Sequence, residues 1–108
     1  MNATSAEVGP EVDEFVLSGL SPLASELVRA PRVSESPIPM ECRLRQVVEV
    51  SPLPGGGDLA LGEVVLFHLR EDLLEAGRID PYKLRAIGRM GGPAYVRTRD
   101  RFEMERPG

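Results

Sequence analysis

The spacing of hydrophobic residues predicts one short helix and a β-hairpin up to residue 69. Apolar side chains recur at helical spacing over residues 11–18, and Gly19 follows them as a helix stop. Residues 42–50 alternate between apolar and charged positions, which is typical of a half-buried strand. Residues 59–69 are apolar on both faces, and a segment of turn formers over 51–58 joins the two. We expect a hairpin with a long, central second strand.

Prolines and glycines interrupt the rest of the chain. Prolines at positions 22, 31, 37 and 39 prevent continuous ladder bonding, so residues 21–40 should follow an extended path that wraps rather than folds locally. Asp80 before Pro81 predicts a second short helix that continues to Leu84. Residues 88–93 should be irregular, and residues 94–96 and 101–104 are candidate edge strands.

Composition points to one small, strand-rich domain over residues 1–108. Hydrophobic residues make up 42% and charged residues 28% of the 108 residues, which suits a packed globular chain. The chain holds 11 Gly and 10 Pro but only 5% aromatic residues and no Trp, so long helices and a thick core are disfavoured. The expected fold class is mainly β.

The charge pattern and the apolar runs exclude several functions. The net charge is −4, residues 1–28 carry five acids and no base, and basic residues elsewhere are interleaved with acids, so we expect no nucleic-acid partner. The longest apolar run, Val64 to Phe67, is far shorter than the roughly 20 residues of a membrane helix. The N-terminus has no secretory signal pattern, and the single Cys42 allows neither an internal disulfide nor a metal cluster. We expect a cytoplasmic protein without a membrane partner, with Cys42 as a small core residue.

Two places hold candidate chemistry. His68 is either a satisfied core or strand-end imidazole or a donor at a ligand pocket, and without a second ligand a metal site is not expected. Residues 89–95 combine Arg89, Gly91, Gly92 and Tyr95, which form either a tight turn or a site where an arginine, close backbone approach and a flat ring meet an anionic ligand. Residues 55–60 fit a dinucleotide fingerprint, but the expected strand after them argues against that function.

Short motifs occur along nearly the whole chain in a specific order. They are residues 13–15 with Gly19 and Leu20, then 30–33, 35–37, 41–42, 62–65 with His68, 77–80, and 88–92 with Tyr95. In order and spacing these motifs resemble the C-terminal half of the flavin reductase-like family.

The resemblance implies a split β-barrel that binds FMN and works as a homodimer, with the flavin near the subunit interface. Such proteins reduce flavin with NADH or NADPH and often supply a partner monooxygenase. The positions it places near the flavin are His68, Arg89, Gly91, Gly92 and Tyr95, and no side chain need act as a covalent catalyst. With the pattern above, the fold should be a mainly β, partial split β-barrel with two short helices.

The resemblance also implies a truncated domain, because the family's preceding half supplies the first barrel strands and most contacts to FMN. We therefore expect FMN binding by this chain to be weak. The alternative function is a non-catalytic interaction or oligomerisation module that binds no flavin and buries its open strand edges against itself or a partner.

Overall fold

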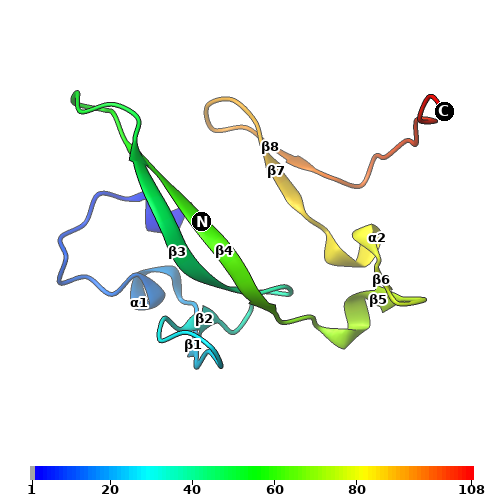
Figure 1. Ribbon diagram of the computed structural model, residues 1–108, viewed down its shortest axis with the longest axis horizontal. Helices are drawn as coiled ribbons and strands as arrows, with labels where there is room; N and C mark the ends of the chain where they lie inside the picture. Colours follow the sequence, from blue (N-terminus) through cyan, green and yellow to red (C-terminus); the bar gives the residue numbers. More distant parts are fainter. Residues whose placement is uncertain (1) are drawn as a thin grey trace. The chain divides into compact units, whose positions relative to one another are not determined.

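The computed structural model describes residues 2–108 and divides the chain into two compact units, Met1–Leu69 and Arg70–Gly108 (Figure 1). Met1, where the N-terminal signal was sought in the sequence, lies outside the described residues. The expectation of a single domain over residues 1–108 stays a prediction.

The first unit opens with a 3-10 turn, η1 (Ala3–Ser5), and a short helix, α1 (Glu14–Ser18). The helix lies where the apolar spacing placed it, but it begins later because Asp13 is its N-cap and accepts a hydrogen bond from the Phe15 amide at 2.8 Å. Gly19 ends the helix in the left-handed conformation at φ 69°, as predicted.

The proline-rich stretch contains a small local sheet, so the prediction that it does not fold locally was wrong. Strand β1 (Pro22–Leu23) pairs antiparallel with β2 (Arg32–Val33). Pro22 has no N–H to donate, but the pairing does not need one, because the Ser34 amide donates to the Ser21 carbonyl at 2.8 Å. Two-residue strands therefore fit between prolines that exclude a longer ladder.

The predicted hairpin is confirmed as β3 (Met40–Glu49) and β4 (Asp58–Phe67), the long arrows of Figure 1. The register contains two bulges, with Arg45 as the extra residue on β3 and Val65 as the extra residue on β4. The expected central position of the second strand was wrong, since β4 pairs only with β3 among the described residues. The expected half-burial was wrong as well, because this two-stranded sheet leaves most of its side chains exposed.

One side of the hairpin forms an apolar face. Cross-strand partners lie on the same face of a sheet, and every second residue of a strand lies on that face. The register therefore places on one face three pairs of partners: Cys42 with Val64, Leu44 with Gly62, and Val47 with Ala60. Leu44 is 66% exposed and Val47 52% exposed, and Cys42 is exposed rather than part of a core as predicted. Exposed apolar side chains therefore line this side of the hairpin.

The second unit consists of short elements joined by tight turns. They are η2 (Glu71–Leu73), β5 (Leu74–Glu75), β6 (Arg78–Ile79), α2 (Pro81–Leu84), β7 (Ile87–Arg89) and β8 (Tyr95–Arg97). Helix α2 is confirmed: Asp80 accepts hydrogen bonds from the Tyr82 and Lys83 amides at 2.8 and 3.4 Å, and Pro81 occupies the first turn.

The last strands follow the prediction only in part. The edge strand expected at 94–96 lies at Tyr95–Arg97, and residues 88 and 89, expected to be irregular, belong to β7. The pairing of Gly88 with Val96 recruits them into the ladder. The strand expected at residues 101–104 is absent, because no segment of residues 2–108 pairs with them.

Buried side chains are few. Among residues 2–108 only Leu73, at 0%, and Glu41, at 2%, are buried. The fold is mainly β with two short helices, as the sequence predicts. No helix in the described part of the chain has both the length and the apolar character that a bilayer crossing requires.

Candidate functional site

The buried carboxylate of Glu41 lies where β3 begins and links this strand to two other segments of the first unit. Its Oε1 accepts hydrogen bonds from the Glu26 amide and from Nε2 of His68, both at 2.7 Å. Its Oε2 accepts a bond from the Leu27 amide, also at 2.7 Å. The loop before β2, the start of β3 and the end of β4 therefore meet at one side chain.

The surroundings of Glu41 keep it ionised. Burial by itself would raise the pKa of this carboxyl, but the bonds from the Glu26 amide, the His68 ring and the Leu27 amide outweigh that cost and lower the pKa to about 2. Near neutral pH the carboxylate therefore accepts hydrogen bonds and does not donate them.

His68 follows the last residue of β4 directly. Its amide donates to the Pro39 carbonyl at 2.9 Å, which extends the hairpin ladder beyond the pair of Met40 and Phe67. The imidazole is 16% exposed and pairs with a carboxylate rather than with main chain. It therefore lies at a strand end, and its role toward a ligand stays a prediction.

The second candidate is the turn between β7 and β8. Arg89 and Tyr95 are direct cross-strand partners, so both side chains lie on the same face of this hairpin. The turn is closed by a bond from the Met90 amide to the Ala94 carbonyl at 3.0 Å and one from the Ala94 amide to the Gly91 carbonyl at 3.2 Å. Gly92 has a φ of 58°, which a residue with a side chain rarely adopts.

The structure brings together some of the predicted site residues. Arg89, Gly91, Gly92 and Tyr95 share one turn, which is also the tight turn that the sequence left as the alternative. His68 belongs to the first unit and the turn to the second, so their joint action stays a prediction.

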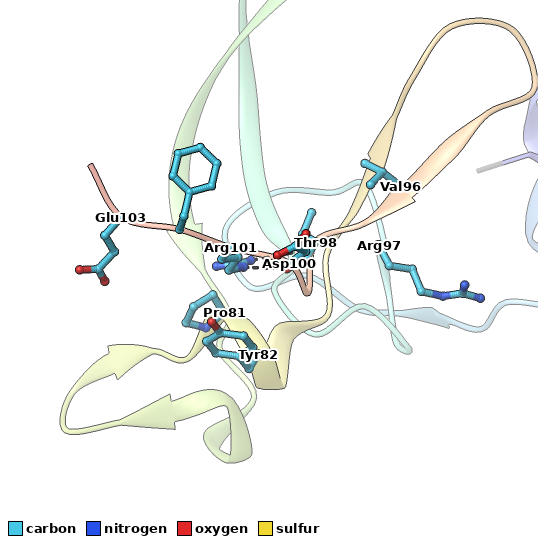
Figure 2. A pocket seen from close by; sticks show the side chains of 9 residues that line it. Pro81, Tyr82, Val96, Arg97, Thr98, Asp100, Arg101 and Glu103 are labelled. Carbon is cyan, nitrogen blue, oxygen red and sulfur yellow. Dashed lines mark hydrogen bonds between the residues drawn. The ribbon is translucent and has the colours of Figure 1, made fainter. Parts of the chain in front are cut away.

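A hollow of about 780 Å³ in the second unit was not predicted (Figure 2). The guanidinium carbon of Arg101 lies 5.6 Å from the centre of the Tyr82 ring, a cation–π distance. Arg97 and Arg101 line the hollow together with Asp100 and Glu103, so its charge is mixed and selects neither anions nor cations. No three His, Cys, Asp or Glu side chains of residues 2–108 are grouped as metal ligands.

Glu41 was not predicted as a candidate site residue from the sequence. A signal existed, because the predicted hairpin pairs the residues before 42 with those after 64, and the only histidine of the chain falls in that stretch. A lone acid between Met40 and Cys42 opposite a lone histidine predicts an ion pair. The two amides of Glu26 and Leu27 could not be found this way, since they come from an irregular loop.

Comparison with known proteins identifies the family. The flavin reductase like domain matches residues 1–98, and this chain belongs to that family. An uncharacterised protein of Halalkalibacterium halodurans is 32% identical over 99% of this chain and 52% of its own length. One of Aquifex aeolicus is 36% identical over 91% of this chain and 48% of its own length. The chain thus spans about half the length of the curated relatives it matches.

Solved structures agree with this assignment. Nitrilotriacetate monooxygenase component B from Bacillus cereus has a TM-score of 0.85 and 36% identity over 95% of this chain and 52% of that one. The 2-nitrobenzoate 2-nitroreductase NbaA of Pseudomonas fluorescens has a TM-score of 0.80 and 27% identity over 99% of this chain and 52% of that one. A structure from Shewanella frigidimarina, described as having a split barrel domain, has a TM-score of 0.81 at 21% identity over 98% of this chain and 53% of that one. The predicted partial split β-barrel is confirmed.

The residues of the β7–β8 turn fit a flavin in their chemistry but do not enclose one. Arg89 offers a cation, and Tyr95, 42% exposed, offers a flat ring. Beside Gly91 and Gly92 there is open space, since a Cβ at either position would meet nothing within 4 Å. The turn by itself therefore does not enclose a ligand, and its role toward flavin stays a prediction.

Proposed function

We propose that this chain forms part of a flavin reductase that binds FMN, transfers hydride from NADH or NADPH to it, and supplies reduced flavin to a monooxygenase. One observation carries the proposal: the chain is 36% identical, over 95% of its length, to a protein described as component B of a monooxygenase. The hydride chemistry belongs to the nicotinamide and the flavin, and the protein positions them.

The proposed roles follow from the chemistry of each side chain. Arg89 neutralises negative charge on the FMN phosphate, for which its forked donors are suited. Tyr95 offers a flat face to the flavin ring, and the two glycines of the turn admit the cofactor closely. His68 hydrogen-bonds the flavin. A phosphate group carries about two negative charges, which one arginine serves poorly. We therefore expect weak binding by this chain alone.

The apolar face of the β3–β4 hairpin supports a site completed by further polypeptide. Leu44 and Val47 remain more than half exposed, and the relatives are about twice as long as the region matched. We propose that the segment of the relatives that this chain does not cover packs on the apolar face and supplies further phosphate contacts.

A fluorescence titration with FMN tests this function on two proteins. One is the 108-residue chain. The other is a fusion that places this chain behind the uncovered segment of the Bacillus cereus protein. We expect a Kd above about 1 μM for the chain, and a yellow fusion that binds FMN more tightly and oxidises NADH or NADPH. Tight binding by the chain would contradict the expected weakness, and a fusion that neither binds FMN nor oxidises either nucleotide would overturn the function.

Variants of the fusion test the location of the site. Arg89→Ala removes a charge-assisted contact and should raise the Kd about 10- to 100-fold, and Tyr95→Ala should raise it about 10-fold. Arg78→Ala removes an exposed arginine of β6 and is the matched control, with no expected effect. An unchanged Kd in both turn variants would show that the flavin binds elsewhere.

The apolar face also favours the second candidate function, a module that associates without flavin, and it fits the expected homodimer. We expect the 108-residue chain to self-associate at micromolar concentration in sedimentation experiments. Leu44→Lys places a charge on the apolar face and should yield monomer, whereas Leu53→Lys, at a 71% exposed loop residue, should not. A colourless, associating fusion would favour this second function over flavin reduction.

A further inference from the structure

With a neutral imidazole, the pair of Glu41 and His68 allows one arrangement of protons. Glu41 Oε1 lies 2.7 Å from His68 Nε2, and the carboxylate is held ionised by two backbone amides and can only accept. A hydrogen bond at this distance therefore needs the proton on Nε2. Both atoms lie within the first unit, in a place with little access to solvent.

A neutral imidazole carries one N–H, so a proton on Nε2 leaves a lone pair on Nδ1. Within residues 2–108 no hydrogen bond reaches Nδ1 of His68, whereas the ring's other nitrogen is fully used. The ring thus has one nitrogen engaged by the protein and one available to a ligand.

We infer that Glu41 is a positioning residue that fixes the neutral His68 ring in the Nε2–H tautomer and presents Nδ1 as a hydrogen-bond acceptor. This inference rests on the proposed function for the identity of the ligand, which we take to be flavin. A neutral Nδ1 accepts from the N–H of the flavin ring and cannot donate to a phosphate. The pair therefore orients the ring edge of the cofactor.

The loop that bonds to Glu41 fixes the orientation of the ionised carboxylate. The consecutive amides of Glu26 and Leu27 each donate to a different carboxylate oxygen, and the Ser25 hydroxyl closes the same loop by donating to the Ala30 carbonyl at 2.6 Å. These two amide donors fix the plane of the carboxylate. They thereby also fix the direction in which Oε1 faces the imidazole.

Because the chain has a single histidine, NMR can test the tautomer without assignment of overlapping signals. The experiment records long-range proton–nitrogen correlations of histidine-labelled full chain at about pH 9, where an ordinary imidazole is neutral. We expect only the Nε2–H tautomer in the native protein and a mixture in concentrated urea. The Nδ1–H tautomer, or the same mixture in both, would overturn the inference without any variant.

Two variants then assign the effect to Glu41. In Glu41→Gln the side chain can donate as well as accept, so both tautomers should appear. Glu63→Gln removes a carboxylate of β4 that pairs with Arg45 and should leave the tautomer unchanged. Retention of a pure Nε2–H tautomer in a folded Glu41→Gln protein would overturn the inference, and amide shifts of the β3–β4 hairpin show whether the variant is folded.

The flavin-binding fusion provides the second readout. His68→Ala and Glu41→Gln should each raise the Kd for FMN about 3- to 10-fold, and the double variant should be no worse than the weaker-binding single variant, because both remove the same contact. Additive effects would overturn the coupling of the two residues. A fusion that binds no FMN would contradict the proposed function, while the NMR result would still decide the tautomer.

Discussion

Replacing Leu73 with alanine should remove most of the stability of the second unit of the chain. The Leu73 side chain is 0% exposed and is the one buried apolar residue among residues 2–108. Truncating a buried leucine to alanine costs about 3 kcal/mol, since the removed methyl groups lose their burial and a cavity remains. At about 0.1 kcal/mol per residue, a unit as short as Arg70–Gly108 has a total stability of about 4 kcal/mol. The substitution removes most of that reserve.

Hydrogen exchange at the Asp80 amide measures the effect. This amide donates to the main-chain carbonyl of Leu73 at 2.8 Å, a bond that alanine preserves, so faster exchange reports unfolding rather than loss of the acceptor. We expect Leu73→Ala to lower the protection of the Asp80 amide about 100-fold and to leave the amides of the β3–β4 hairpin unchanged.

Leu74→Ala is the matched control, because it deletes the same atoms from the next residue. Leu74 is 38% exposed, so its loss should cost less than about 1 kcal/mol. Equal losses of protection in the two variants would refute the reasoning that Leu73 stabilises the second unit through its burial.

The N-cap of α2 and the carboxylate of Glu41 should each stabilise the structure measurably. Asp80→Ala removes the acceptor for the Tyr82 amide and should destabilise α2 by about 1 kcal/mol, measured by exchange at that amide, while Asp80→Asn should restore most of the loss. Because the pKa of Glu41 falls from its ordinary 4.5 to about 2, its stabilisation is complete above pH 4.5 and is lost as the pH falls toward 2. The amide shifts of Glu26 and Leu27 should follow this titration, and an acid transition that persists in Glu41→Gln would contradict the assignment.

Local signals in the sequence predicted most of the regular elements. Gly19 and Asp80 mark helix ends through left-handed backbone and a side-chain cap, which depend only on neighbouring residues. The cap at Asp13 was not predicted, so the first helix was expected to begin too early. The hairpin follows from two apolar stretches around a turn segment. The exposure of the hairpin could not be predicted, because burial depends on what packs on a sheet. Alternation at residues such as Leu44 indicates only which face is apolar.

The candidate site was predictable only where a motif is continuous in sequence. Residues 89–95 form a turn whose glycines and cross-strand pair can be recognised locally. The ion pair of His68 with Glu41 follows only from the pairing of the predicted hairpin, and the two amides that complete its surroundings come from an irregular loop that no pattern predicts. The role of these residues toward flavin stays a prediction.

The two bulges of the β3–β4 hairpin determine where its length can change. Arg45 and Val65 are the extra residues, one on each strand, so both strands contain ten residues. Deleting either one leaves all other cross-strand partners in place and makes that part of the ladder regular. Deleting any other single residue from a strand shifts the remaining pairs by one and turns part of the apolar face to the opposite side. Within the strands, homologous hairpins that keep this surface should therefore differ by a single residue only at these two positions.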